Sequence, residues 1–445
     1  TSCFNDTYHS FTVSFIDDEF DLHELAMDCK KMSGKTARTD LADNVKGLKD
    51  SHGMAGRVTA AVTDCEPSML VCGRDFEERD ITTHIGCCNH RFECTTALVF
   101  NGPGVKRTMI LQRALVTRYI KSSQMADRLK EMCGIPKVPS LQVVHDMETR
   151  WNSTFSSVER TRQLPDAIQL RERLDNIAPM LADDDWEVLK LIEPILRPFM
   201  EAQTEMEGAK YVTGSLVVPY VHNLRRELDK ARSSLNGMFT VLGHSDTLWE
   251  DFINRWGTGK HIMTVREGKR RQPRGFKLEQ LLVTALDPRS KSLYGVEEDD
   301  QDAVWQEVHK AAVKIETEAR TSTQAPSGVV DMTTPEAVAD ACRHSSNAPA
   351  SSAYVSTGSF QSQQVVYQVG LEVDSFKYLA SSDPIDANDQ YLNPLVWWKI
   401  KKKDYPLLAN LTRRVLAIPA SQAQSERLFS SAGLIVSKRR NRLSP

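Results

Sequence analysis

Cysteine is scarce in this sequence, and its distribution excludes one class of protein. Nine cysteines stand among 445 residues, an odd number at irregular spacing over a long chain. This pattern argues against a disulfide framework and favours a reducing compartment, either the cytosol or the nucleus. Long hydrophobic runs are missing as well, since no stretch approaches the roughly 18 apolar residues of a membrane helix. The sequence therefore predicts no membrane segment.

A strong charge of one sign is also missing. The 56 Lys and Arg residues nearly balance the 59 Asp and Glu residues, and the formal net charge is −3. No basic field covers the whole chain, so any binding of nucleic acid must come from local patches. The hydrophobic fraction of 40% is typical of a globular protein. The length predicts two or three domains of roughly 100–200 residues each.

The N-terminal part, residues 1–85, has the pattern of a mixed α/β domain. Apolar and polar residues alternate over 11–15, which is the period of a β-strand. A second, less regular strand follows, and residues 37–51 have the apolar spacing of a helix. Residues 57–64 are typical of a buried strand, and this strand ends in Asp64. Strands, a helix and a further strand predict a mixed sheet covered by helices.

The composition changes three times along the rest of the chain. Residues 86–315 are rich in Leu, Arg, Glu and Met, which predicts a helical domain. Residues 316–369 are rich in Ser, Thr, Ala and Gln, which predicts a mostly disordered linker. Residues 370–445 return to an ordered pattern, with two helices expected on either side of Pro419.

A run of motifs in a fixed order occupies residues 405–443. The motifs are Tyr405-Pro-Leu-Leu-Ala, Ile418-Pro-Ala-Ser, Ser425-Glu-Arg-Leu-Phe-Ser-Ser-Ala-Gly and Lys438-Arg-Arg-Asn-Arg-Leu. This series resembles the C-terminal dimerisation region of the hAT transposase superfamily. Earlier blocks agree in order, namely Val62-Thr63-Asp64, Cys87-x-x-His90, Thr149-Arg150-Trp151-Asn152-Ser153-Thr154 and Leu286-Asp287-Pro288-Arg289-x-Lys291. The last block is similar to a segment of BED-finger-type members, and the resemblance covers nearly the whole chain.

The resemblance implies a fold and a chemistry. The fold is an α/β RNase H-like (DDE-type) domain that a large all-α insertion interrupts and a helical C-terminal dimerisation region completes. The chemistry is metal-dependent cutting of DNA, in which three carboxylates hold two divalent ions. Asp64 matches the second acid and Glu426 the third, and oxygen ligands suit Mg²⁺ or Mn²⁺. From the residues alone, Asp64 would be a strand-end cap and Glu426 a charge near the start of a helix.

Two departures from the family pattern leave the activity open. Thr1 and Ser2 match the end of an Asp-x-x-Thr-Ser pattern, so the first catalytic Asp would lie three positions before Thr1. The BED zinc finger is absent, and we expect a fragment, because no Met and no signal peptide open the sequence. One hypothesis is a catalytically incomplete protein that binds DNA and dimerises. The alternative is an active transposase whose first Asp lies upstream.

Three further groups are candidates for binding DNA or metal. Arg150 and Trp151 match a block that the resemblance assigns to handling DNA ends, and the alternative is a core Trp beside a solvated Arg. A basic loop is a candidate for contacting phosphates or is solvated surface, and its residues are Lys269, Arg270, Arg271 and Arg274. Cys87, His90 and Cys94 have a spacing compatible with Zn²⁺, but no fourth ligand is evident. We expect Cys87 and His90 to be structural support beside the second acid.

The helices of 405–433 carry more apolar residues than one sheet edge needs to cover. Leu407, Leu411 and Val415 share one stripe. If part of this surface is exposed, a two-fold dimer would bury it; the alternative is that all of it is intramolecular core. We expect self-association through 370–445, as a homodimer or higher oligomer, with DNA as a second partner and no membrane. The resemblance implies a nuclear protein.

Overall fold

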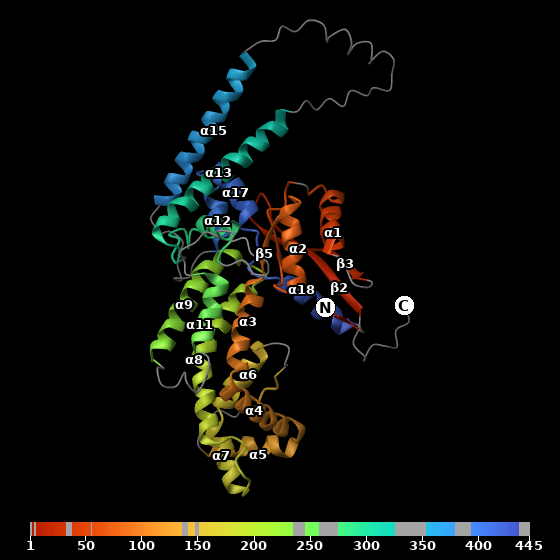
Figure 1. Cartoon of the computed structure of the whole chain (residues 1–445), viewed down its shortest axis with the longest axis vertical. Coiled ribbons are helices and arrows are strands. Elements are labelled where there is room, and N and C mark those ends of the chain that lie inside the picture. The colour runs from red at the N-terminus through yellow and green to blue at the C-terminus, as the bar shows by residue number, and fades with distance from the viewer. Residues whose placement is uncertain are drawn as a thin grey trace.

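The computed structural model describes residues 2–3, 6–32, 38–54, 56–135, 141–146, 151–234, 245–257, 275–324, 353–378 and 393–435. The molecule is elongated, with a column of helices along its length and the strands to one side of the middle (Figure 1). Helices α4 to α7 form one end of the column, and the pair α13 and α15 forms the other.

Two small sheets occupy the N-terminal part. An antiparallel sheet has the order β1–β2–β3, with β1 at Ser2–Cys3, β2 at Asp6–Ile16 and β3 at Leu22–Met32. A parallel pair joins β4 (Ala60–Thr63) to β5 (Thr83–Gly86). Helices α1 (Arg38–Ser51) and α2 (Pro67–Glu78) cover the strands. The predicted strands and helix are confirmed, although β4 is shorter than 57–64.

The lower part of the column has its own hydrophobic core. Its helices are α3 (Cys88–Asn101), α4 (Pro103–Lys121), α5 (Ser123–Gly134), α6 (Trp151–Arg162), α7 (Pro165–Leu174), α8 (Asp183–Met206), α9 (Val217–Ser234) and α11 (Ser245–Trp256), with a 3-10 turn at Gly214–Leu216. The rings of Phe92, Phe199, Phe252 and Trp256 meet inside it. Helical structure was predicted for this part of the sequence, and it is confirmed.

A second core joins the middle of the chain to its C-terminal part. Its helices are α12 (Leu278–Leu286), α13 (Glu298–Gln324), α15 (Ala353–Tyr378), α16 (Pro394–Lys401), α17 (Pro406–Val415) and, at its edge, α18 (Ala423–Ile435). Trp398 lies at its centre against Phe376 and Tyr405, and its indole N–H donates to the Leu286 carbonyl at 2.9 Å. The prediction of one helical domain over 86–315 therefore ends too late, because α12 and α13 pack with the C-terminal helices.

The predicted linker over 316–369 is also wrong in part. Helix α13 continues to Gln324, and α15 begins at Ala353. Val365 and Val369 are buried in the second core, four residues apart and in line with Val373 and Phe376. This spacing places all four on one helix face. The polar composition hid the stripe, because only one residue in three or four of α15 faces the core.

Candidate functional site

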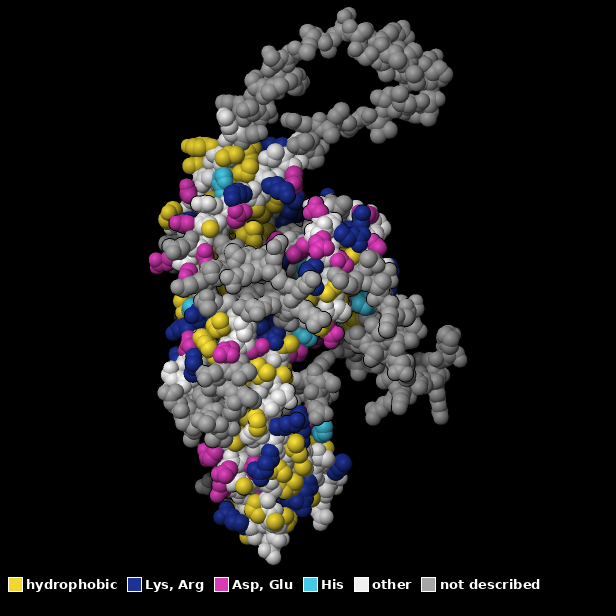
Figure 2. Space-filling model, viewed as in Figure 1, with side chains coloured by type: hydrophobic (Ala, Val, Ile, Leu, Met, Phe, Trp, Pro, Cys, Tyr) yellow, Lys and Arg dark blue, Asp and Glu magenta, His cyan; other side chains and the backbone are white. Residues whose placement is uncertain are grey.

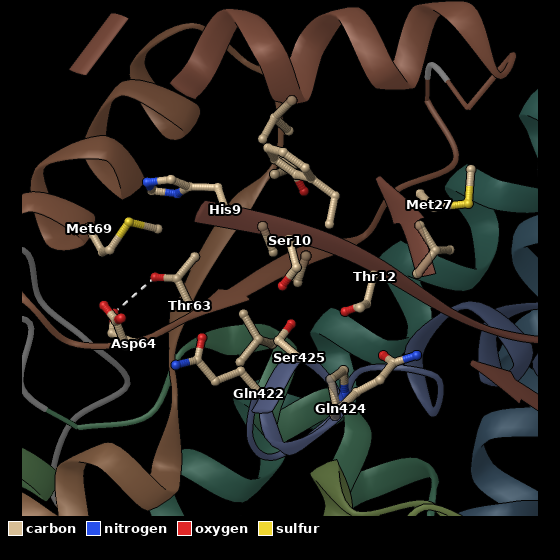
Figure 3. Close-up of a pocket in the computed structure, with 18 of the residues that line it drawn as sticks. His9, Ser10, Thr12, Met27, Thr63, Asp64, Met69, Gln422, Gln424 and Ser425 are labelled. Atoms are coloured by element: carbon tan, nitrogen blue, oxygen red, sulfur yellow. Dashed lines mark hydrogen bonds between the residues drawn. The ribbon is translucent and has the colours of Figure 1, made fainter. Parts of the chain in front are cut away.

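A cavity of about 480 Å³ lies between β2, β4 and the start of α18 (Figure 3). Asp64 and Glu426 both line it. The fold therefore brings two carboxylates from opposite ends of the chain to one opening, which is the placement that the metal-site hypothesis requires. His9, Gln422 and Ser425 lie on the same wall. The role of the two acids as metal ligands stays a prediction.

Local backbone geometry positions Asp64. It follows directly on β4, and the amide of Cys87 donates to the Thr63 carbonyl at 2.6 Å, so pairing with the neighbouring segment continues to the last residue of the strand. The Asp64 Oδ1 accepts a hydrogen bond from the Glu66 amide at 3.2 Å, just before α2 begins at Pro67. Asp64 thus also makes the strand-end contact that its sequence position predicted.

Backbone contacts across the two cores position Glu426. The amide of Cys88 donates to the Ala420 carbonyl at 3.0 Å, and the Ala420 amide donates to the Thr213 hydroxyl at 3.0 Å. A side chain at Gly214 would meet the Ile418 carbonyl, because an added Cβ would lie 2.2 Å from that oxygen. The loop before α18 is therefore held on the helical core. Glu426 follows in the first turn of α18 and is exposed.

A buried histidine supports the strand end beside Asp64. The Nε2 of His84 lies 2.7 Å from the Thr63 hydroxyl, which in turn lies 2.9 Å from the Asp64 carbonyl and can donate to it. Burial lowers the pKa of His84 from 6.5 to about 4, against the opposing influence of Glu77, so the ring is neutral near pH 7. Gly73 makes room for this ring, since a Cβ there would lie 2.1 Å from its Nδ1.

The cysteines beside the cavity have the properties of core thiols. Burial raises the pKa of Cys87 to about 12, and Cys88 is shifted well upward for the same reason. His90 is partly exposed, with its Nδ1 3.8 Å from Glu93, and Cys94 is half-buried. Within the described parts of the chain, no three His, Cys, Asp or Glu side chains gather as a metal site. Cys87 instead joins β4 to α3 through its backbone.

Trp151 lies in the lower core. Its ring is 8% exposed and packs against Phe155, and its indole N–H donates to Gln203 at 2.7 Å. A base would need an open ring face, so this geometry fits the core alternative for Trp151. Arg150 and the predicted basic loop lie outside the described residues, the loop being Lys269, Arg270, Arg271 and Arg274.

The apolar stripe of α17 is intramolecular core. Leu408, Leu411 and Val415 are all buried in the second core, and Leu407 packs against it. The prediction that exposed residues of this stripe recruit a second copy is wrong for these side chains. The large apolar side chains that α15 and α16 do expose are Val366, Tyr367, Leu371, Tyr378, Val396 and Ile400. Apolar side chains are visible on that end of the molecule in Figure 2.

One basic helix escaped the sequence reasoning. Helix α4 carries five Lys and Arg in 19 residues and no Asp or Glu. Its exposed cations are Lys106, Arg107, Arg118 and Lys121. The signal is present in the sequence, but these residues are spread at helical spacing and form no contiguous run.

Comparison with known proteins identifies one region and three similar chains. Residues 376–445 match the hAT family C-terminal dimerisation region. The human zinc finger BED domain-containing protein 4 is 26% identical over 330 residues, which cover 74% of this chain and 25% of that protein. A Zea mays protein described as an AC transposase is 22% identical over the full chain and 54% of its own length.

A third similar chain comes from a fungus. A Talaromyces stipitatus protein described as the transcriptional regulator tpeD is 21% identical over the full chain and 51% of its own length. The present chain thus spans between a quarter and about half of these relatives.

Proposed function

We propose, for a chain that belongs to the hAT family, a transposase-derived protein that self-associates through its C-terminal region and binds DNA in the nucleus. We further propose that the 445-residue chain by itself does not cleave DNA. The observation that carries the proposal is the match of residues 376–445 to a dimerisation region.

Exposed apolar side chains within that region support self-association. Tyr378 is 76% exposed, Val396 42% and Ile400 68%. Buried at an interface, an Ile side chain contributes about 1.5–3 kcal/mol, which corresponds to a tenfold to hundredfold change in affinity. The surface of α16 that carries Val396 and Ile400 is therefore our candidate for contact with a second copy.

Light scattering at micromolar concentration tests self-association, with a dimer or larger species as the expected result. Ile400→Glu should weaken the association tenfold or more, roughly as the buried area predicts. Ile110→Glu is the matched control, because Ile110 is exposed on α4, far from the C-terminal region. A folded sample that stays monomeric would refute the proposal, as would equal weakening by both variants.

Helix α4 supports DNA binding, independently of the C-terminal region. Its exposed cations could contact phosphates, which give affinity without sequence preference. Lys106→Glu with Lys121→Glu should weaken binding of duplex DNA and reduce the slope of log K against log salt by roughly 0.9 for each lost phosphate contact. Lys230→Glu on α9 is the control, because Lys230 is exposed and pairs with Glu227. Unchanged binding by the double variant would remove α4 from the DNA surface.

For the fold, we propose that the two sheets with α1 and α2 are the first part of an RNase H-like domain. The shared cavity of Asp64 and Glu426 supports this arrangement. Their carboxylates suit Mg²⁺ or Mn²⁺ as hard oxygen ligands, and a bound ion would stabilise charge on reacting phosphate oxygens. Two carboxylates fit only part of a three-acid site. The alternative function, an active transposase, requires the first Asp upstream of Thr1.

A cleavage assay separates the two functions. The purified chain should leave supercoiled DNA intact in Mg²⁺ or Mn²⁺, because two acids cannot reproduce the charge of a three-acid site. Glu66→Gln serves as the control, since Glu66 is an exposed acid that also lines the cavity. Metal-dependent nicking that Glu426→Gln abolishes and Glu66→Gln preserves would establish the alternative.

A further inference from the structure

The two sheets face each other across the cavity with strand edges that lack a partner strand. β1 pairs with β2 only at Ser2 opposite Thr7 and Cys3 opposite Asp6. Beyond Thr7, no described strand pairs with that edge of β2, and among the described strands β4 pairs with β5 alone. Residues 9–14 of β2 and 60–64 of β4 both line the cavity. The cavity therefore separates two backbone edges that could each hydrogen-bond to a strand.

The walls of the cavity differ in polarity, and the difference matches the alternation of a strand. On one side α1 and α2 present Leu41, Val45, Met69 and Phe76. On the other side α18 presents Gln422, Gln424 and Ser425 (Figure 3). Successive side chains of a strand point to opposite faces, so an inserted strand with alternating apolar and polar residues would satisfy both walls.

We propose that this slot accepts an extended segment that continues β1 upstream from Ser2 and runs antiparallel to β2. The direction follows from the register, because each residue before Ser2 would lie opposite the next residue of β2 after Thr7. Six residues placed before Thr1 would then lie opposite His9 to Ser14. Their far edge would face β4, and the five strands would form one sheet in the order β3–β2–β1–β4–β5. Open strand edges bind extended segments in this way.

The inference is independent of the metal site and of self-association. It uses the backbone edges of β2 and β4 and the polarity of the walls, so it stands or falls without Glu426 or the α16 surface.

An N-terminal extension of six residues tests the proposal. Phe11 packs against the α1–α2 core, so the extension residue opposite it, the third before Thr1, should be apolar. Thr-Val-Thr-Val-Thr-Val placed before Thr1 meets this requirement. Val-Thr-Val-Thr-Val-Thr has the same composition in the opposite phase, and Thr-Pro-Thr-Pro-Thr-Pro lacks the donors that a strand needs.

Hydrogen exchange of the backbone amides of residues 8–14 and 60–63 reports the insertion. The in-phase extension should slow their exchange roughly tenfold or more relative to the proline extension, and the opposite phase should protect them less. Equal exchange in all three proteins would overturn the proposal. The protection should also survive tenfold dilution; loss on dilution would mean that the strand comes from a second copy, which contradicts insertion in line with β1.

Discussion

Substitution of Leu408 decides whether the α17 stripe belongs to the core or to a dimer surface. Leu408 is fully buried in the second core, and its backbone amide donates to Glu372 at 3.0 Å, a bond that Ala would keep. Leu408→Ala should therefore cost about 2–5 kcal/mol of unfolding free energy, the sum of lost burial and a cavity. Leu371→Ala removes the same atoms from a side chain that is 54% exposed on α15, and should change stability by less than about 0.5 kcal/mol.

Tryptophan fluorescence during urea unfolding measures both variants, because Trp398 lies in the same core and reports its loss. Light scattering of the folded proteins completes the comparison. The core interpretation predicts that Leu408→Ala lowers the unfolding midpoint while the folded protein associates as before. A variant of unchanged stability that no longer associates would mean that Leu408 contacts a second copy, and the assignment of the stripe to the core would be wrong.

Three further predictions concern the strand end and the lower core. Because the pKa of His84 is lowered from 6.5 to about 4, protonation favours the unfolded state; stability should be complete above pH 6.5 and fall by about 3 kcal/mol in all towards pH 4, and His84→Gln should flatten the dependence measured by urea unfolding. Gly73→Ala should cost about 1–3 kcal/mol, because its Cβ displaces the His84 ring, and NMR of that ring should show the shift; an unmoved ring signal would contradict the packing. Trp151→Ala should cost about 3–5 kcal/mol, since it removes a buried indole and leaves Gln203 without that donor; a loss of DNA affinity at full stability would instead restore the base-stacking role.

The sequence predicted local structure better than it predicted packing. The period-2 alternation of β2 survives because one face of that strand packs on α1 and α2, and Phe11 shows this packing. The polarity of α15 misled the linker prediction, because burial of Val365 and Val369 depends on α13, about 50 residues away. The exposed fraction of the α17 stripe was likewise invisible, since tertiary contacts decide which apolar residues remain for a partner. Order of motifs, in contrast, placed Asp64 and Glu426 on one cavity without any knowledge of the loop geometry that holds them.

The wide sequence separation within the cavity has a consequence for synthesis on the ribosome. The lower core is encoded almost contiguously between Cys88 and Trp256, with Ala420 as its one late contributor. The cavity wall needs β2 from the start of the chain and α18 from its end. Because domains fold as they emerge, the lower core can form during translation while the cavity still lacks one side. Until α18 is released, β2, β4 and the apolar faces of α1 and α2 are open to chaperones and to other nascent chains, and a truncation before Ala423 would leave them so permanently.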